Sequence, residues 1–146
     1  MTMNTRTQTQ PWGLTVLRVV TGVIFLMHAW QKLAIFGIQG FTGFLTQAGV
    51  PAPGIAAVVV TSVELIGGLA LVLGLGTRWA ALLLAFDMLV ALLTVHLPGG
   101  FFVPDGIEFV LLLLAANIAL GLAGGALALD AVVRGRRSTA PGAATA

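Results

Sequence analysis

Residues 54–75 read GIAAVVVTSVELIGGLALVLGL, a stretch whose only charged residue, Glu64, stands among small and aliphatic side chains. A helix needs about 20 mostly apolar residues to cross the hydrocarbon core of a bilayer, and this stretch has that length. Three more stretches, 12–36, 78–97 and 106–127, have a similar character. The ~10-residue alternation of a membrane β-barrel is absent, and lipid does not tolerate open sheet edges. The sequence therefore predicts an all-α, polytopic membrane protein built as a four-transmembrane-helix bundle.

The composition of the whole chain agrees with a protein in lipid. Of its 146 residues, 58% are hydrophobic and 8% are charged, and the mean hydropathy is +1.05. A soluble domain carries roughly 25% charged residues. The net charge of +2 comes from basic residues that form no stripe, so nucleic-acid binding is not expected. The chain has no cysteine, which excludes disulfides, Fe–S ligation and thiol chemistry within it.

The ordered part of the chain is predicted to be one membrane domain, residues 12–130. Residues 1–11 are expected to form a short cytoplasmic tail. Residues 131–146, which combine arginines with a Ser/Thr/Pro/Ala stretch, are expected to form a disordered cytoplasmic tail. Between the second and third spans, Gly76 suits the end of one helix and Thr77 suits the start of the next.

The basic residues predict the orientation in the membrane. One side of a four-span topology carries Arg6, Arg78 and the cluster at 134–137. The other side carries Lys32 at a helix end and the acids Asp105 and Glu108. By the positive-inside rule, both termini are expected in the cytoplasm.

The first outer connection, residues 40–49, is not featureless. Phe41, Phe44, Leu45 and Ala48 recur there at helical spacing. The segment is either a short helix lying at the outer membrane interface or an irregular loop with aromatic anchors. The sequence leaves both alternatives open.

Charge inside a membrane span is expensive and usually faces the interior of the bundle. The candidates for an intramembrane polar cluster are Arg18, His28, Lys32, Glu64, Asp87, His96 and Glu108. Those on each predicted helix share a face with small residues, as expected where helices pack together. At ~1.5 Å per residue, Glu64 and Asp87 lie near the midplane, with Arg18 within reach of either. The other four lie toward the outer side, so the set suggests a polar path from the bundle centre to the outer surface.

Each candidate also has a purely structural interpretation. Arg18 with Glu64 or Asp87 forms an ion pair that fixes helix register. Lys32 extends to the headgroups. Asp105 and Glu108 form a capping box at the start of the fourth helix.

The two histidines have structural interpretations as well. His96 is solvated at a helix end, and His28 is a hydrogen-bonded core histidine. A haem held by His28 and His96 is disfavoured, because their estimated depths differ. No zinc-ligand spacing, phosphate loop or nucleophile elbow is present, so no metal is expected.

A set of short motifs runs along residues 17–130: Leu17-Arg18, Gly22, His28 with Lys32-Leu33, Gly49-Val50-Pro51, Glu64-Leu65-Ile66-Gly67-Gly68, Gly74-Leu75-Gly76-Thr77-Arg78, His96 before a Gly-Phe loop, and Glu108. In order and spacing, this set resembles the DoxX family of small four-helix membrane proteins. Many relatives have glycine after the histidine, where this chain has Ala29. The resemblance implies association with an oxidoreductase more than an activity of the chain itself. The best-known members resemble membrane subunits of a thiosulfate:quinone oxidoreductase, and others are linked to complexes that handle oxidative or thiol stress.

The leading hypothesis is a subunit of a membrane redox complex in the plasma (inner) membrane of a bacterium, linked to the quinone pool or to thiol or sulfur redox. Its partners would be the lipid bilayer and the other subunits of that complex. A quinone would need an apolar slot, hydrogen-bond donors such as His28 or Arg18, and carboxyl groups that carry protons. The alternatives are a small-molecule carrier or sensor, and a non-catalytic scaffold whose charges serve helix pairing.

Overall fold

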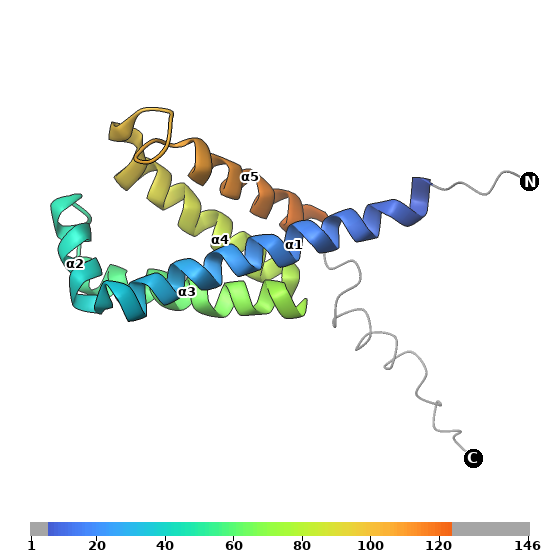
Figure 1. The fold of residues 1–146 in the computed structure, drawn as a ribbon, viewed down its shortest axis with the longest axis horizontal. Coiled ribbons are helices and arrows are strands. Elements are labelled where there is room, and N and C mark those ends of the chain that lie inside the picture. The colour runs from blue at the N-terminus through green and yellow to red at the C-terminus, as the bar shows by residue number, and fades with distance from the viewer. Residues whose placement is uncertain (1–5, 124–146) are drawn as a thin grey trace, which may run out of the picture.

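The computed structural model describes residues 6–123, with residues 6–11 as backbone alone, and all of its regular structure is helical (Figure 1). The long helices are α1 (Arg6–Trp30), α3 (Pro53–Leu73), α4 (Thr77–Ala91) and α5 (Glu108–Ala123). The short elements are a first π-helical turn (Gln31–Ile35), α2 (Gly37–Gln47), a second π-helical turn (Leu92–His96) and a 3₁₀ turn (Leu97–Gly99). The predicted all-α class is confirmed.

Among the described residues, three helical segments are long and apolar enough to cross a membrane: Trp12–Ile35, Pro53–Leu73 and Thr77–Gly99. The fourth predicted span begins at Glu108 rather than at 106, and its described part, Glu108–Ala123, is shorter. The expected end of that span at 127 and the tail at 131–146 lie outside the described residues. Helix α1 begins at Arg6, before the predicted start at 12, because hydropathy marks only the part of a helix that faces lipid.

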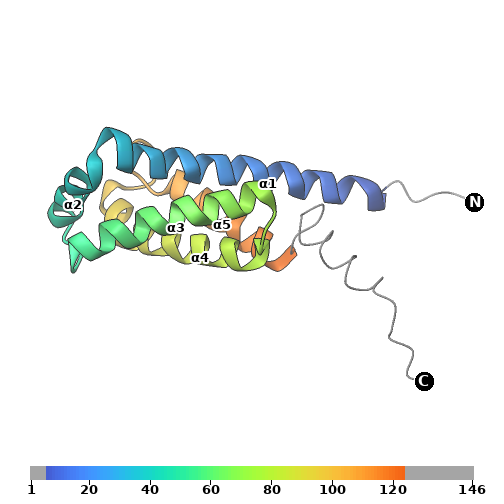
Figure 2. The same cartoon turned by 90° about the horizontal axis from the view of Figure 1, so that it is seen from below.

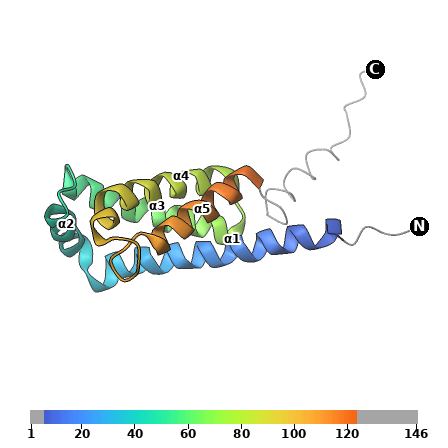
Figure 3. The same cartoon turned by 90° about the horizontal axis from the view of Figure 1, so that it is seen from above.

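The helices form two antiparallel hairpins, α1 with α3 and α4 with α5, as Figures 2 and 3 show. Two glycines bring α1 and α3 together. A methyl group placed at Gly22 would lie 2.8 Å from the carbonyl oxygen of Gly68, and one at Gly68 would lie 2.9 Å from that of Gly22. The two backbones are therefore in direct contact, the close approach that small residues permit in membrane helix pairs.

The second hairpin packs onto the first through α3 and α4. A methyl group at Gly67 of α3 would lie 2.9 Å from the Leu84 side chain of α4. Between α4 and α5, a methyl group at Gly121 would lie 2.9 Å from the Leu82 side chain. A core that includes Phe25, Leu84 and Leu120 fills the space among the helices.

The turn between α3 and α4 differs from the prediction by two residues. Gly74, with φ of 71°, ends α3, and its N–H donates to the carbonyls of Ala70 and Leu71. Gly76, with φ of 53°, precedes α4 rather than ending α3, and Thr77 is the first residue of α4 rather than its cap. Both glycines adopt left-handed conformations that other residues resist, so the turn uses two such positions where one was predicted.

The open question about residues 40–49 is resolved in favour of a helix. Helix α2 lies across the end of the bundle, opposite the turn between α3 and α4 (Figure 1). Its buried residues, Phe41 and Leu45, pack with Ala57 of α3. Helix α2 thus covers the end of the first hairpin.

Candidate functional site

The two hairpins lie close together at the turn between α3 and α4 and diverge toward α2 (Figure 1). At the divergent end they enclose a cavity of about 780 Å³, lined by α1, α2, α3, α4 and α5. Most of its wall is aliphatic or aromatic, with phenylalanines contributed by α1, α2 and α5. Both π-helical turns border it. Turns of this kind occur often at functional sites.

Five of the seven predicted polar residues line this cavity: His28, Lys32, Glu64, Asp87 and His96. Arg18 and Glu108 do not belong to its lining. The five residues come from α1, α3, α4 and both π-helical turns, so side chains from both hairpins meet at this cavity.

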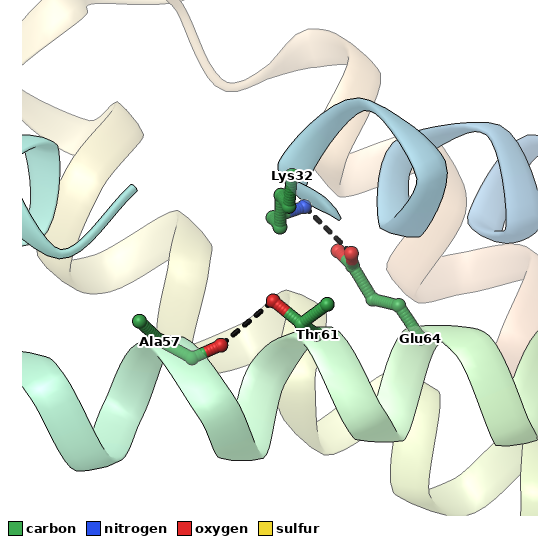
Figure 4. A network of polar contacts seen from close by, with 4 residues as sticks. All are labelled: Lys32, Ala57, Thr61 and Glu64. Atoms are coloured by element: carbon green, nitrogen blue, oxygen red, sulfur yellow. Dashed lines mark hydrogen bonds and ion pairs between the residues drawn. The ribbon is translucent and has the colours of Figure 1, made fainter. Parts of the chain in front are cut away.

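The centre of the site is an ion pair between Lys32 of the first π-helical turn and Glu64 of α3. The Lys32 Nζ atom lies 2.6 Å from Glu64 Oε2, and the two side chains are 11% and 4% exposed. Figure 4 shows the two side chains extending toward each other between the helices, with Thr61 on the same face of α3. Lys32 Nζ also lies 5.1 Å from the centroid of the Phe41 ring on α2, in cation–π contact. A buried charge pair therefore links the first π-helical turn with α2 and α3.

The direction of these side chains follows from helix geometry. Side chains in a helix lean toward its N-terminus. For Lys32 that direction leads into the bundle, because α1 runs toward α2. For Glu64 it leads toward α2, because α3 runs the opposite way. The prediction that Lys32 extends outward to the headgroups is wrong for this reason.

Arg18 makes a different contact from the one predicted. Its Nη1 atom donates to the backbone carbonyl of Leu71 and, at 3.3 Å, to that of Val72, at the C-terminal end of α3. Glu64, one of its two expected partners besides Asp87, is bonded to Lys32 instead. The last carbonyls of a helix lack partners within the helix and carry partial negative charge, which a guanidinium satisfies well.

Asp87 lines the cavity from α4, in the second hairpin. It is 8% exposed, and its Oδ2 atom has no hydrogen-bond partner among the described residues. Asp87 lies within electrostatic range of both Glu64 and Lys32. The cavity therefore contains two buried carboxyl groups and one ammonium group.

His28 lies on the wall formed by α1. Its ring centroid is 6.2 Å from that of Phe109 on α5, at an interplanar angle of 33°. Both residues line the cavity, and no hydrogen bond of the His28 ring occurs within the described part of the chain. The imidazole is half-buried and faces an apolar neighbour.

His96 and Glu108 hold the connection between α4 and α5. His96 Nδ1 lies 3.2 Å from the carbonyl oxygen of Asp105. Glu108 Oε1 accepts a hydrogen bond of 2.9 Å from the backbone N–H of Val103. The predicted capping box does not form, because α5 begins at Glu108 itself and its carboxylate bonds Val103 rather than the Asp105 backbone.

Several cavity residues were not singled out from the sequence, among them Gln31, Met88 and Phe109. Phe41 was noted only for its helical spacing within 40–49, in a segment expected at the outer membrane interface, and not as part of a site. Within the described residues, no three His, Cys, Asp or Glu side chains gather closely enough to hold a metal ion.

The fold and the cavity define a small helical membrane protein with a mostly apolar pocket that contains buried polar groups. The DoxX family profile matches residues 13–97, and the chain belongs to this family. It is 38% identical to "Putative oxidoreductase CatD" of Bacillus subtilis over 122 residues, covering 83% of this chain and 87% of the relative. It is 33% identical to an uncharacterized protein of Haemophilus influenzae over 133 residues, covering 88% and 96% of the two chains. No solved structure matches the chain at a significant level.

Proposed function

We propose that this protein is a subunit of a membrane oxidoreductase complex and that its cavity binds a lipid-soluble redox ring of the quinone type. The observation that carries the proposal is the cavity of about 780 Å³, whose wall is mostly apolar and which contains buried polar groups. Ligand sites are concave and mostly apolar, with a few polar groups that fix orientation. The name of the Bacillus subtilis relative, which refers to an oxidoreductase, supports the redox part of the proposal.

The residues of the cavity fit such a ring. Phe41 and Phe109 offer flat apolar surfaces, and the imidazole of His28 offers a group that both donates and accepts hydrogen bonds. When bound, the ring would supply the two-electron chemistry. His28 would orient a ring oxygen and exchange a proton with it, and Asp87 would offer a second polar contact on the opposite wall. The Lys32–Glu64 pair would keep its part of the cavity wall charged and fixed in shape.

The proposal includes a membrane topology. Helix α5 would be the fourth span, so that both termini face the cytoplasm of a bacterial cell with the protein in its plasma (inner) membrane. Trp12 and Trp79 are exposed near one end of α1 and α4, and Trp30 is exposed near the other end of α1. Tryptophan favours the two interfaces of a bilayer, so these positions support spans of the expected depth.

The test is purification of the full chain from its native membranes in a gentle detergent. Mass spectrometry of the preparation would identify bound lipid-soluble compounds, and proteomics would identify partner subunits. We expect a stoichiometric quinone and at least one redox subunit. A Phe109→Trp variant, which fills the cavity beside His28, should carry less quinone than the parent while retaining the partner.

Two results would contradict the proposal. If the parent carries no quinone and gains none when the compound is supplied to nanodiscs containing the protein, the cavity is not a quinone site. If a redox partner is retained without any quinone, the scaffold alternative takes the place of the proposal.

A further inference from the structure

The charged groups of the cavity differ in whether they have hydrogen-bond or ion-pair partners. The Lys32 ammonium contacts Glu64 and the Phe41 ring, and Glu64 Oε2 accepts the hydrogen bond from Lys32. Asp87 is buried to the same degree as this pair and lines the same cavity, yet its Oδ2 atom has no partner among the described residues. A buried oxygen without a partner is destabilising and has a strong preference for a ligand that satisfies it.

From this asymmetry we infer that Asp87 is the residue that recognises the ligand, and that it selects a ring carrying a hydroxyl group. The inference rests on the proposed function and deepens it. If the cavity takes quinone-type rings, Asp87 makes it prefer the reduced, hydroxylated form over the oxidised, carbonyl form.

The preference follows from the hydrogen-bonding capacity of each partner. A carboxylate only accepts hydrogen bonds, whereas a carboxylic acid both donates and accepts them. A ring hydroxyl also does both, so it bonds the Asp87 side chain in either protonation state. A carbonyl or an ether oxygen only accepts, so it bonds the acid and is repelled by the carboxylate. The cavity wall, which includes Phe25, Met88 and Leu113, suits the apolar body of such a ring.

A pair of probes that do not undergo quinone chemistry isolates this hydroxyl. Calorimetry would measure binding of para-butylphenol and of its methyl ether to the full chain in lipid nanodiscs, with empty nanodiscs subtracted. The parent is expected to bind the phenol at least about fivefold more tightly than the ether, as one hydrogen bond in a buried site provides. In Asp87→Leu this preference should fall below about twofold.

The matched control is Thr94→Val. Thr94, in the second π-helical turn, also lines the cavity, but its hydroxyl already donates a hydrogen bond of 2.8 Å to the Val90 carbonyl. Removing that hydroxyl should leave the preference for the phenol unchanged. A similar loss in Thr94→Val would overturn the assignment to Asp87.

A measurement on the parent protein tests the inference even if Asp87→Leu does not fold. Infrared difference spectra of chain labelled with ¹³C at its aspartate carboxyl carbons should show a carboxyl band that shifts with the phenol and not with the ether. Equal binding of both probes, or no shifted band, overturns the inference and leaves the cavity a ligand site. If neither probe binds, the ligand site itself is refuted, and the proposed function loses its basis together with the inference.

Discussion

At the scale of single residues, the Lys32–Glu64 pair shows how chain direction decides which charges meet. Because α1 and α3 are antiparallel, their side chains lean in opposite directions along the bundle. Lys32, just after α1, leans away from α2, and Glu64 leans toward α2, so the two charged groups meet. Lys32 Nζ lies 2.6 Å from Glu64 Oε2, and both side chains are largely shielded from solvent. In such surroundings an ion pair contributes little net stability compared with an apolar replacement, but the loss of one partner is costly.

This asymmetry gives a prediction for Glu64→Leu. The substitution leaves the Lys32 ammonium buried without its partner, which should lower the free energy of unfolding by about 3–5 kcal/mol. Equilibrium unfolding of the purified protein in micelles, followed by circular dichroism, measures the change.

The matched control for Glu64→Leu removes both charges. The double variant Lys32→Met with Glu64→Leu should recover most of the lost stability, because no uncompensated charge remains. Parent-like stability of Glu64→Leu alone would mean that the ion pair does not form in the membrane protein.

His28→Gln tests the redox role at the same scale. Glutamine keeps a hydrogen-bonding side chain of similar reach, so the protein should fold and keep its partners. It does not exchange a proton near neutral pH as imidazole does. We expect quinone-linked electron transfer, measured in membranes that contain the whole complex, to fall at least about tenfold with unchanged protein abundance. Parent-like turnover would remove His28 from the mechanism, and loss of the folded protein would give it a structural role.

At the scale of elements, the contact of α1 with α3 depends on two glycines. A methyl group at Gly22 would meet the Gly68 carbonyl oxygen at 2.8 Å and the Leu71 Cβ atom at 3.0 Å, neither of which moves without moving α3. Gly22→Ala should therefore separate the helices and destabilise the protein by about 1–3 kcal/mol. A melting experiment in micelles measures the loss.

Gly13→Ala is the matched control, because Gly13 lies in the same helix with nothing within 4 Å of the added methyl group. Alanine is the better helix former, so this variant should be as stable as the parent or slightly more stable. Equal melting temperatures for the two variants would show that α1 and α3 do not touch at Gly22.

The same elements show what the sequence predicts and where it stops. Residues 54–75 were predicted as one helix from their length and apolarity alone, and α3 (Pro53–Leu73) occupies almost the same range. Hydropathy did not predict the π-helical turns at Gln31–Ile35 and Leu92–His96, since a change in backbone winding leaves no trace in it. Periodicity placed Glu64 and Lys32 on interior faces, but the rise per residue placed Arg18 within reach of Glu64 or Asp87 and did not predict the Lys32–Glu64 pair. The reason is that spacing along one helix does not fix how far that helix is shifted along its neighbour.

At the scale of the whole molecule, the two hairpins place the ends of the helices on two sides. The start of α1, the turn at Gly74–Gly76 and the described end of α5 lie at one end, while α2 and the connection from Leu97 to Ile107 lie at the other (Figure 3). An arrangement of this kind suits an even number of spans. The exposed aliphatic side chains along α1, which include Val16, Val20 and Val23, then face lipid.

This arrangement predicts the outcome of reporter fusions in living bacterial cells. A reporter that is active only in the cytoplasm should be active at Gly76, where Arg78 follows at the start of α4, and at the C-terminus. A reporter that is active only outside should be active at Gly43 in α2 and at Gly100. The reason is that arginines, which gather in the sequence at the end of the bundle that holds Gly76, resist transfer across the membrane, while the other end carries acids and a buried lysine. An outside C-terminus with a cytoplasmic Gly76 would mean that α5 does not cross the bilayer. If all four positions were reversed, the two hairpins would stand but the positive-inside assignment would be wrong, and the end of the bundle that holds the cavity would lie on the cytoplasmic side.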